Sequence, residues 1–438
     1  MMPRRSRYFG LSLLLLSALA QPLPAAADDT LYRALGGQQG IRQVVDTFLP
    51  LVLADARIKD NFADFDIEQL NQRLQEQFCE LSGGPCRYTG QHRDKTMDGV
   101  GTVRDMTTVH QDLQISNAMF NALAEDLQIA LQQHGVANSA SNRLLALLAP
   151  MQRQIVTARA TSAMPPIPDM GKLLATGGVS TVEGAAGGGI VPWALIGGYG
   201  TRDSWGANAH YTYLGTQDYQ LASYGVAVGI ADRLEISLAD QQFKGSLAPL
   251  DRLDIRQHIV GVKVKLAGDI VYDQDSAMPQ VAAGILYKRH QRLGGLGALG
   301  LSKVQQLGAS DDHGYDYYVA ATKLMLEHSL LLNATVRATR ANQMGLLGFG
   351  GDQGNRMRLM PEFSVAYLAD RKLALGAEYR RKPHNLGVDH EKAYYDAFVA
   401  WFPNKQLSLT LAYAVLGDIT VFNPKRQRGV YLSVQAGF

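Results

Sequence analysis

The sequence predicts two domains, an all-α domain followed by an antiparallel, membrane-spanning β-barrel of about 14 strands. Three observations carry this prediction. The period of the apolar residues changes from three or four to two near residue 173. The links between the later segments alternate between short turns and long loops. At 438 residues, the chain is also longer than one ordinary domain.

The first 27 residues have the pattern of a secretory signal peptide. Arg4, Arg5 and Arg7 precede the apolar run GLSLLLLSALA, and PAAA offers small residues for cleavage after Ala27. We therefore expect a mature chain that starts near Asp28 and folds in an oxidising compartment. The formal net charge is only +2, so there is no electrostatic case for nucleic acid as a partner.

Residues 28–157 have helical periodicity. Segments such as IRQVVDTFLPLVLAD and SNAMFNALAEDLQIALQQHG repeat apolar side chains at steps of three and four residues, which predicts an all-α domain. Residues 158–172 contain Pro165, Pro166 and Pro168 and have no period, so we expect a short, stiff linker. The barrel is expected over residues 173–438.

The two cysteines, Cys79 and Cys86, lie in EQFCELSGGPCRYTG. On an unbroken helix, positions seven residues apart lie about 10 Å apart, too far for a disulfide. The intervening SGGP breaks the helix and can fold Cys86 back toward Cys79. A disulfide is therefore a candidate, and two free thiols are the alternative.

The second half alternates with period two. In KLALGAEYRR, Leu373, Leu375 and Tyr379 share one face, whereas Glu378 and Arg380 take the other. Fourteen segments behave in this way, near residues 173–183, 190–199, 205–214, 219–229, 232–242, 254–266, 280–290, 314–324, 328–339, 357–367, 372–382, 394–402, 406–416 and 428–438. Short turns alternate with long loops, except that the link 267–279 is longer than this scheme requires.

This pattern is typical of an outer-membrane barrel, because only a closed barrel satisfies all backbone groups of strands in lipid. A soluble β-sandwich is the alternative. Aromatic residues near segment ends are candidates for interface girdles: Trp193, Tyr199, Trp205, Tyr394, Tyr395 and Trp401. The final Phe438 resembles the terminal aromatic signal of outer-membrane proteins. An even strand count places both barrel ends in the periplasm, and hence the helical domain as well.

The helical half resembles the group I truncated haemoglobins, which have a 2-on-2 helical fold, over roughly residues 30–157. The matching pieces occur in family order: LYRALGGQQGIRQVVDTF, VLADARIKDNF, SGGPCRYTG, MTTVHQDLQIS and LLALLAPMQRQIV. The resemblance implies heme b as cofactor, with His110 as proximal ligand of the iron and Phe62 as a heme-packing residue. A lone helical histidine is otherwise usually a surface or core residue.

The distal side departs from the family pattern of a tyrosine and a glutamine that hydrogen-bond dioxygen. Alignment with the family places Leu49 at the tyrosine position and Leu70 and Leu74 on the distal helix. The distal pocket is therefore expected to be apolar. Gln77 can still reach inward, Phe78 is a further cofactor-binding candidate, and Arg73 either pairs with a heme propionate or faces solvent.

Two other histidines have weaker cases. His134 precedes a helix C-terminus, where a structural role is the better explanation. His92 lies in the segment 91–105, which is longer than the family link to the proximal helix and is expected to be mobile.

Three functions follow from this sequence. The first is a periplasmic heme protein that senses or carries dioxygen, carbon monoxide or nitric oxide. The second is a nitric oxide detoxifying heme enzyme, and the third is a transporter that the globin plugs or regulates. The barrel half resembles an uncharacterised family of Gram-negative outer-membrane proteins, which implies outer-membrane lipid and the barrel assembly machinery as partners.

Overall fold

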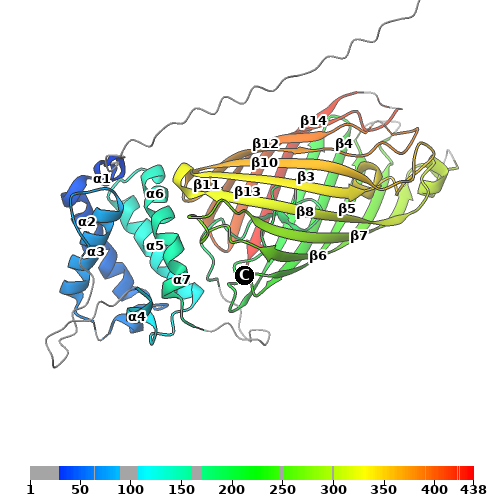
Figure 1. Cartoon of the computed structure of the whole chain (residues 1–438). Helices are drawn as coiled ribbons and strands as arrows, with labels where there is room; N and C mark the ends of the chain where they lie inside the picture. Colours follow the sequence, from blue (N-terminus) through cyan, green and yellow to red (C-terminus); the bar gives the residue numbers. More distant parts are fainter. Residues whose placement is uncertain are drawn as a thin grey trace, which may run out of the picture.

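The computed structural model contains a helical domain at one end of a long β-barrel (Figure 1). It describes residues 29–63, 65–88, 106–158, 170–246, 250–297, 300–389, 391–421, 423 and 425–438. The expected signal peptide, the segment 91–105 with His92, and most of the proline-rich linker lie outside the described residues.

The helical domain is built from short and medium helices around one apolar core. Its elements are α1 Thr30–Ala34, α2 Gly37–Ala54, η1 Lys59–Phe62, α3 Ile67–Leu81, α4 Met106–His110, α5 Asn117–Gln133, α6 Asn138–Leu148, η2 Ala149–Met151 and α7 Gln152–Ile155. Asp66 caps α3 and Ser116 caps α5, each accepting a backbone hydrogen bond from the first turn. In the part of the chain that the structure describes, no helix is both long and apolar enough to cross a bilayer.

The β-barrel is closed and antiparallel, which confirms the predicted architecture. Within the described residues it has 12 strands, and β14 pairs with β3 to close the sheet. The strands are β3 Trp205–Thr216, β4 Tyr219–Ile230, β5 Leu234–Gly245, β6 Asp254–Ala267, β7 Gln280–Gly294, β8 His313–Met325, β9 Leu330–Thr339, β10 Arg358–Asp370, β11 Leu373–Arg380, β12 Tyr394–Asn404, β13 Leu407–Gly417 and β14 Gln427–Gly437.

The two faces of the barrel differ as the alternation predicts. Glu235, Lys263 and Glu378 are buried in the lumen. Large apolar side chains are exposed on the outside, for example Tyr211, Val226, Leu238, Val260, Val319, Val336, Phe363, Leu411, Leu432 and Phe438. Such an apolar outer surface around a polar interior is typical of a barrel that spans a membrane.

The prediction of barrel strands at 173–183 and 190–199 is wrong. These residues belong to a plug, defined here as residues 173–204, which fills the lumen before β3 begins. Residues 177–201 are all buried, and only a two-residue pair, β1 Val179–Ser180 with β2 Ala186–Gly187, is sheet-like. The segment is rich in glycine, and its large side chains, such as Trp193 and Ile196, are buried in the lumen and do not face lipid.

Three of the aromatic residues expected in the interface girdles lie inside the barrel. Trp193 and Tyr199 lie in the plug and Tyr394 faces inward, and all three are buried. Tyr395 and Trp401 are exposed on the outer face, as expected for residues that meet a membrane interface.

The helical domain sits at the short-turn end of the barrel, the end at which the plug enters β3 (Figure 1). Asn142 donates from its Nδ2 to Ser329 Oγ at 3.0 Å, and Glu125 pairs with Lys405 at 2.6 Å. The unexpectedly long turn between β6 and β7 also contacts this domain, since its Tyr272 hydroxyl donates to Asn121 at 2.8 Å. The long turn is therefore part of the contact between the two domains.

Candidate functional site

The helical domain contains a large apolar cavity of about 320 Å³. Helices α2 to α6 contribute to its lining, and residues at the short-turn end of the barrel, including Leu326, Leu368 and Phe402, close one side. The cavity brings together all the heme-pocket residues expected from the sequence, which are Leu49, Phe62, Leu70, Arg73, Leu74, Gln77, Phe78 and His110.

His110 ends α4 and is half-buried against this cavity. Its Nδ1 lies 2.7 Å from the backbone carbonyl oxygen of Met106, one helical turn earlier. Because a carbonyl can only accept, Nδ1 carries the proton and Nε2 carries the lone pair of the neutral ring. Burial lowers the pKa of the imidazole below its ordinary value, which favours this neutral, metal-binding form.

The lining that α2 and α3 contribute is mainly apolar. Leu49 and Phe78 are buried, and Leu70 and Leu74 pack partly buried against the same core. Phe62 is also partly buried against this core. This lining therefore offers packing surface rather than donors to a ligand beside it.

Two polar side chains of α3 also line the cavity. Gln77 is buried, and its Nε2 lies 3.7 Å from the sulfur of Met151, a weak acceptor. Arg73 is part-buried and forms an ion pair of 3.0 Å with Glu76. Both residues line the cavity, so each remains available for the role expected from the sequence.

The cavity has further lining residues that the sequence did not predict, among them Phe48, Val52 and Tyr88. Phe48 and Val52 lie on the same face of α2 as Leu49, and Tyr88 follows the cysteine loop. The step of three and four residues along α2 could have revealed Phe48 and Val52, because it places them on one helical face. No periodic signal surrounds Tyr88.

Cys79 and Cys86 form a disulfide, with Cα atoms 5.7 Å apart. The link folds the chain back after α3 and holds residues 86–88 near the cavity. Gly84 allows this fold, because a Cβ there would lie 2.6 Å from both Cys79 Sγ and the ring of Tyr32. The glycine-rich SGGP turn is thus a steric requirement of the loop.

These residues fit a heme. The cavity is large and apolar, as the flat porphyrin requires, and it holds an imidazole whose tautomer is fixed by a backbone carbonyl. Histidine bound in this way is the usual proximal ligand of globin iron. In the described residues, no group of three or more His, Cys, Asp or Glu side chains could hold a bare metal ion.

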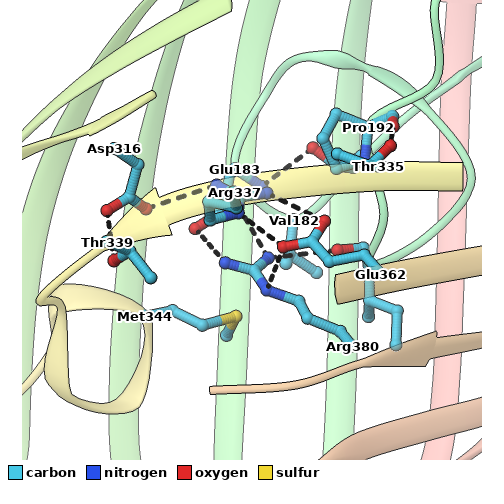
Figure 2. Close-up of polar contacts among 12 residues, drawn as sticks. Val182, Glu183, Pro192, Asp316, Thr335, Arg337, Thr339, Met344, Glu362 and Arg380 are labelled. Carbon is cyan, nitrogen blue, oxygen red and sulfur yellow. Dashed lines mark hydrogen bonds and ion pairs between the residues drawn. The ribbon is translucent and has the colours of Figure 1, made fainter. Parts of the chain in front are cut away.

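A cluster of buried acidic and basic side chains lies inside the barrel (Figure 2). Glu183 of the plug pairs with Lys288, with Arg380 at 2.7 Å and with Arg337 at 3.2 Å. Arg337 also pairs with Glu362, and Lys288 with Asp316. We call these six residues the lumen ion cluster: Glu183, Lys288, Asp316, Arg337, Glu362 and Arg380.

The lumen ion cluster contains three carboxylates and three cations, so its formal charge is balanced. All six side chains are buried. A buried ion pair must recover the cost of removing both charges from water, and each charge here has at least two partners or a bidentate one. The cluster therefore anchors the plug rather than offering an open polar path through the barrel.

Fold and site together define a globin-type helical domain joined to a closed, plugged β-barrel. The chain belongs to the family described as protein of unknown function (DUF3034), which matches residues 176–435, and its helical domain matches the bacterial-like globin family over residues 30–157.

The helical domain has relatives among the group 1 truncated hemoglobins. The group 1 truncated hemoglobin of Tetrahymena pyriformis is 29% identical over 113 residues, which are 26% of this chain and 83% of the relative. The group 1 truncated hemoglobin of Synechocystis sp. is 32% identical over 111 residues, 24% of this chain and 79% of that protein. The predicted truncated globin is thereby confirmed.

Solved structures resemble each half separately. The Fe(III) crystal structure of truncated hemoglobin from Tetrahymena pyriformis aligns with 29% of this chain and 97% of its own, at 25% identity and a TM-score of 0.25. The NanC porin aligns with 52% of this chain and 98% of its own, at 11% identity and a TM-score of 0.35.

Proposed function

We propose that this protein binds heme b in its globin domain and uses the iron to hold a diatomic gas in the periplasm, as a sensor or carrier anchored to an outer-membrane barrel. The observation that carries the proposal is the geometry of His110. Its Nδ1 is held by the Met106 carbonyl, and its ring borders the apolar cavity. A neutral Nε2 in this position is the donor that heme iron requires.

Each residue of the cavity then has a role. His110 is the axial ligand, Phe62 and Phe78 pack against the porphyrin, and Leu49, Leu70 and Leu74 form the distal wall. Arg73 lines the cavity, where it can pair with a propionate, and Gln77 is the distal donor expected from the sequence. A bound heme supplies an iron with a position open to dioxygen, carbon monoxide or nitric oxide.

The absorption spectrum tests the proposal. Full-length protein purified in detergent and supplied with hemin should show a Soret band, which carbon monoxide shifts after reduction. A protein that takes up no hemin contradicts the proposal.

Replacing Leu49 with tyrosine should slow dioxygen release roughly tenfold, because a hydrogen bond to bound dioxygen contributes about 1–1.5 kcal/mol. Leu49 is buried on the distal wall, so a hydroxyl there points toward the ligand position. Stopped-flow dissociation measures the effect, and Leu49→Phe controls for ring size alone. Equal rates for Leu49→Tyr and Leu49→Phe would show that this position does not face bound ligand.

The barrel supports a periplasmic position for the globin. Outer-membrane barrels place short turns in the periplasm and long loops outside the cell. The globin contacts the short turns of this barrel, through Ser329, Leu368 and Lys405. Protease added to intact cells should therefore spare the globin, whereas permeabilising the outer membrane should expose it. Cleavage of the globin on intact cells contradicts this topology.

The contact between the domains depends on a buried amide. Asn121 donates from its Nδ2 to the backbone oxygen of Gly171 at 2.8 Å and accepts from the Tyr272 hydroxyl. Asn121→Ala leaves both partners unsatisfied, at a cost of about 1–3 kcal/mol. We expect faster release of the globin by limited proteolysis.

Asn71→Ala is the matched control for that change, because Asn71 donates to Asp46 on the exposed surface within the globin. It should leave the proteolysis rate unchanged. If both variants are cleaved at the wild-type rate, the Asn121 amide does not hold the domains together.

A transport role for the barrel is the second candidate, and the plug is the observation that favours it. The residues buried in the lumen belong to the plug, whereas the globin lies at the end of the barrel and does not fill it. Nitric oxide detoxification at the same iron needs bound dioxygen and an electron donor, and the apolar distal wall favours it less.

A further inference from the structure

A second apolar cavity lies in the barrel lumen, at the long-loop end, away from the globin. Its volume is about 270 Å³. Val182 and Ile190 of the plug form its floor, and Met344, Leu347 and Ile419 of the long loops contribute to its roof. The lumen of an outer-membrane barrel is normally polar, so an apolar chamber inside it requires an explanation.

The strands change character at the level of this cavity. Along β3, the inward positions are Asn208, His210 and Thr212, and then Leu214. Neighbouring β4 has Ser223 followed toward the cavity by Leu221. Along β6, Gln257 gives way to Ile255 in the same direction. On these three strands, polar inward side chains next to the plug give way to aliphatic ones at the cavity, although Ile259 of β6 packs among apolar plug residues further along.

The roof contains two strained residues. Gln343 and Met344 have φ values of 44° and 62°, a left-handed conformation that residues with a Cβ rarely adopt. Gln343 is held there by Asp389, which accepts from its Nε2 at 2.6 Å, and by Glu391, which accepts from its backbone N–H. Strain of this kind persists where surrounding structure enforces it, and it concentrates at ligand clamps.

The roof is also joined to the plug. Lys288 donates from its Nζ to the backbone oxygen of Met344 at 3.1 Å, and the same ammonium group pairs with Glu183 and Asp316. A molecule that lifts Met344 therefore acts on the lumen ion cluster that anchors the plug.

We propose that this cavity is a binding site for a small, uncharged, apolar molecule of the alkane or monocyclic arene class, which enters from the long-loop side. A cavity of roughly 150 Å³ lined by Leu, Ile and Phe stays dry and takes up benzene, and the present cavity is larger and lined in the same way. Its lining residues with polar groups, Tyr219, Gln343, Tyr394 and Thr420, bring no formal charge to a ligand.

Photolabelling of the full-length chain in lipid nanodiscs tests this site. The probe is a phenyl(trifluoromethyl)diazirine, and mass spectrometry of the peptides maps its attachment. We expect labelling of peptides that carry Leu221, Ile255 and Leu293, and saturating toluene should reduce it roughly tenfold by competition. Labelling of the outer face around Leu238, which lipid covers, should not change with toluene.

Leu221→Trp fills the cavity and should abolish the labelling that toluene competes, whereas Leu238→Trp on the outer face is the matched control. The competition with toluene uses the wild-type chain, so it tests the proposal even if Leu221→Trp does not fold. Label confined to the outer face, or cavity label that toluene does not displace, overturns the proposal. If the cavity is labelled in lipid-free amphipol but not in nanodiscs, a lipid acyl chain occupies it in the bilayer. This outcome also overturns the proposal.

Discussion

Replacing His110 with alanine is expected to remove the five-coordinate heme from the globin domain. Among the described residues, His110 is the histidine that lines the cavity. Its Nδ1 donates a hydrogen bond to the Met106 carbonyl oxygen, which leaves Nε2 to bind iron. Without that ring, the porphyrin keeps only apolar packing. Titration of hemin into wild type and His110→Ala, followed at the Soret band, measures the effect.

His134→Ala is the matched control for this variant. His134 is exposed at the end of α5, where its Nε2 lies 2.7 Å from the Thr47 hydroxyl, and it does not line the cavity. It should bind hemin as wild type does. A His110→Ala protein with an unchanged five-coordinate spectrum would end the ligand assignment, whatever the His134 variant does.

Replacing Glu183 with glutamine should loosen the plug and open the barrel. Glu183 is buried with Lys288, Arg337 and Arg380, and the amide keeps its shape but removes its charge. Breaking a buried pair by neutralising one partner costs about 3–5 kcal/mol, because the other charges stay buried and uncompensated. We expect a lower unfolding temperature, and ion conductance in planar bilayers where wild type stays closed.

Asp251→Asn provides the control for charge removal, since Asp251 is exposed in the loop between β5 and β6. It should match wild type in both measurements. A Glu183→Gln barrel that stays closed and unfolds at the wild-type temperature would show that the lumen ion cluster does not hold the plug. Conductance of the wild type would show that the plug leaves a path.

The alternation of apolar and polar residues along the chain is sufficient to predict most strands of the barrel. In β11, Leu375 and Tyr379 are exposed outside and Glu378 and Arg380 are buried inside, as their alternation predicts. This works because side chains alternate across a strand regardless of what the neighbouring strands are. The same reasoning failed at 173–183 and 190–199, because buried glycine-rich segments have no solvent or lipid face to reveal their position.

The residues of the heme cavity also divide into those that the sequence predicts and those that it does not. His110, Phe62 and the leucines were predicted because the order of short motifs matches a known family, which confines them to one pocket. Tyr88 and the barrel turns around Leu326 were not, because they reach the cavity only after the cysteine loop folds back and the two domains dock. Such contacts have no signature in the adjacent sequence.

By itself, the sequence determined a helical globin followed by an antiparallel barrel, because period, loop length and motif order are properties of neighbouring residues. Only the tertiary structure decided that residues 173–204 plug the lumen, that Glu183 meets three cations from distant strands, and that an apolar chamber remains above the plug. Those features depend on which side chains face one another across a closed barrel, and closure is a global property of the chain.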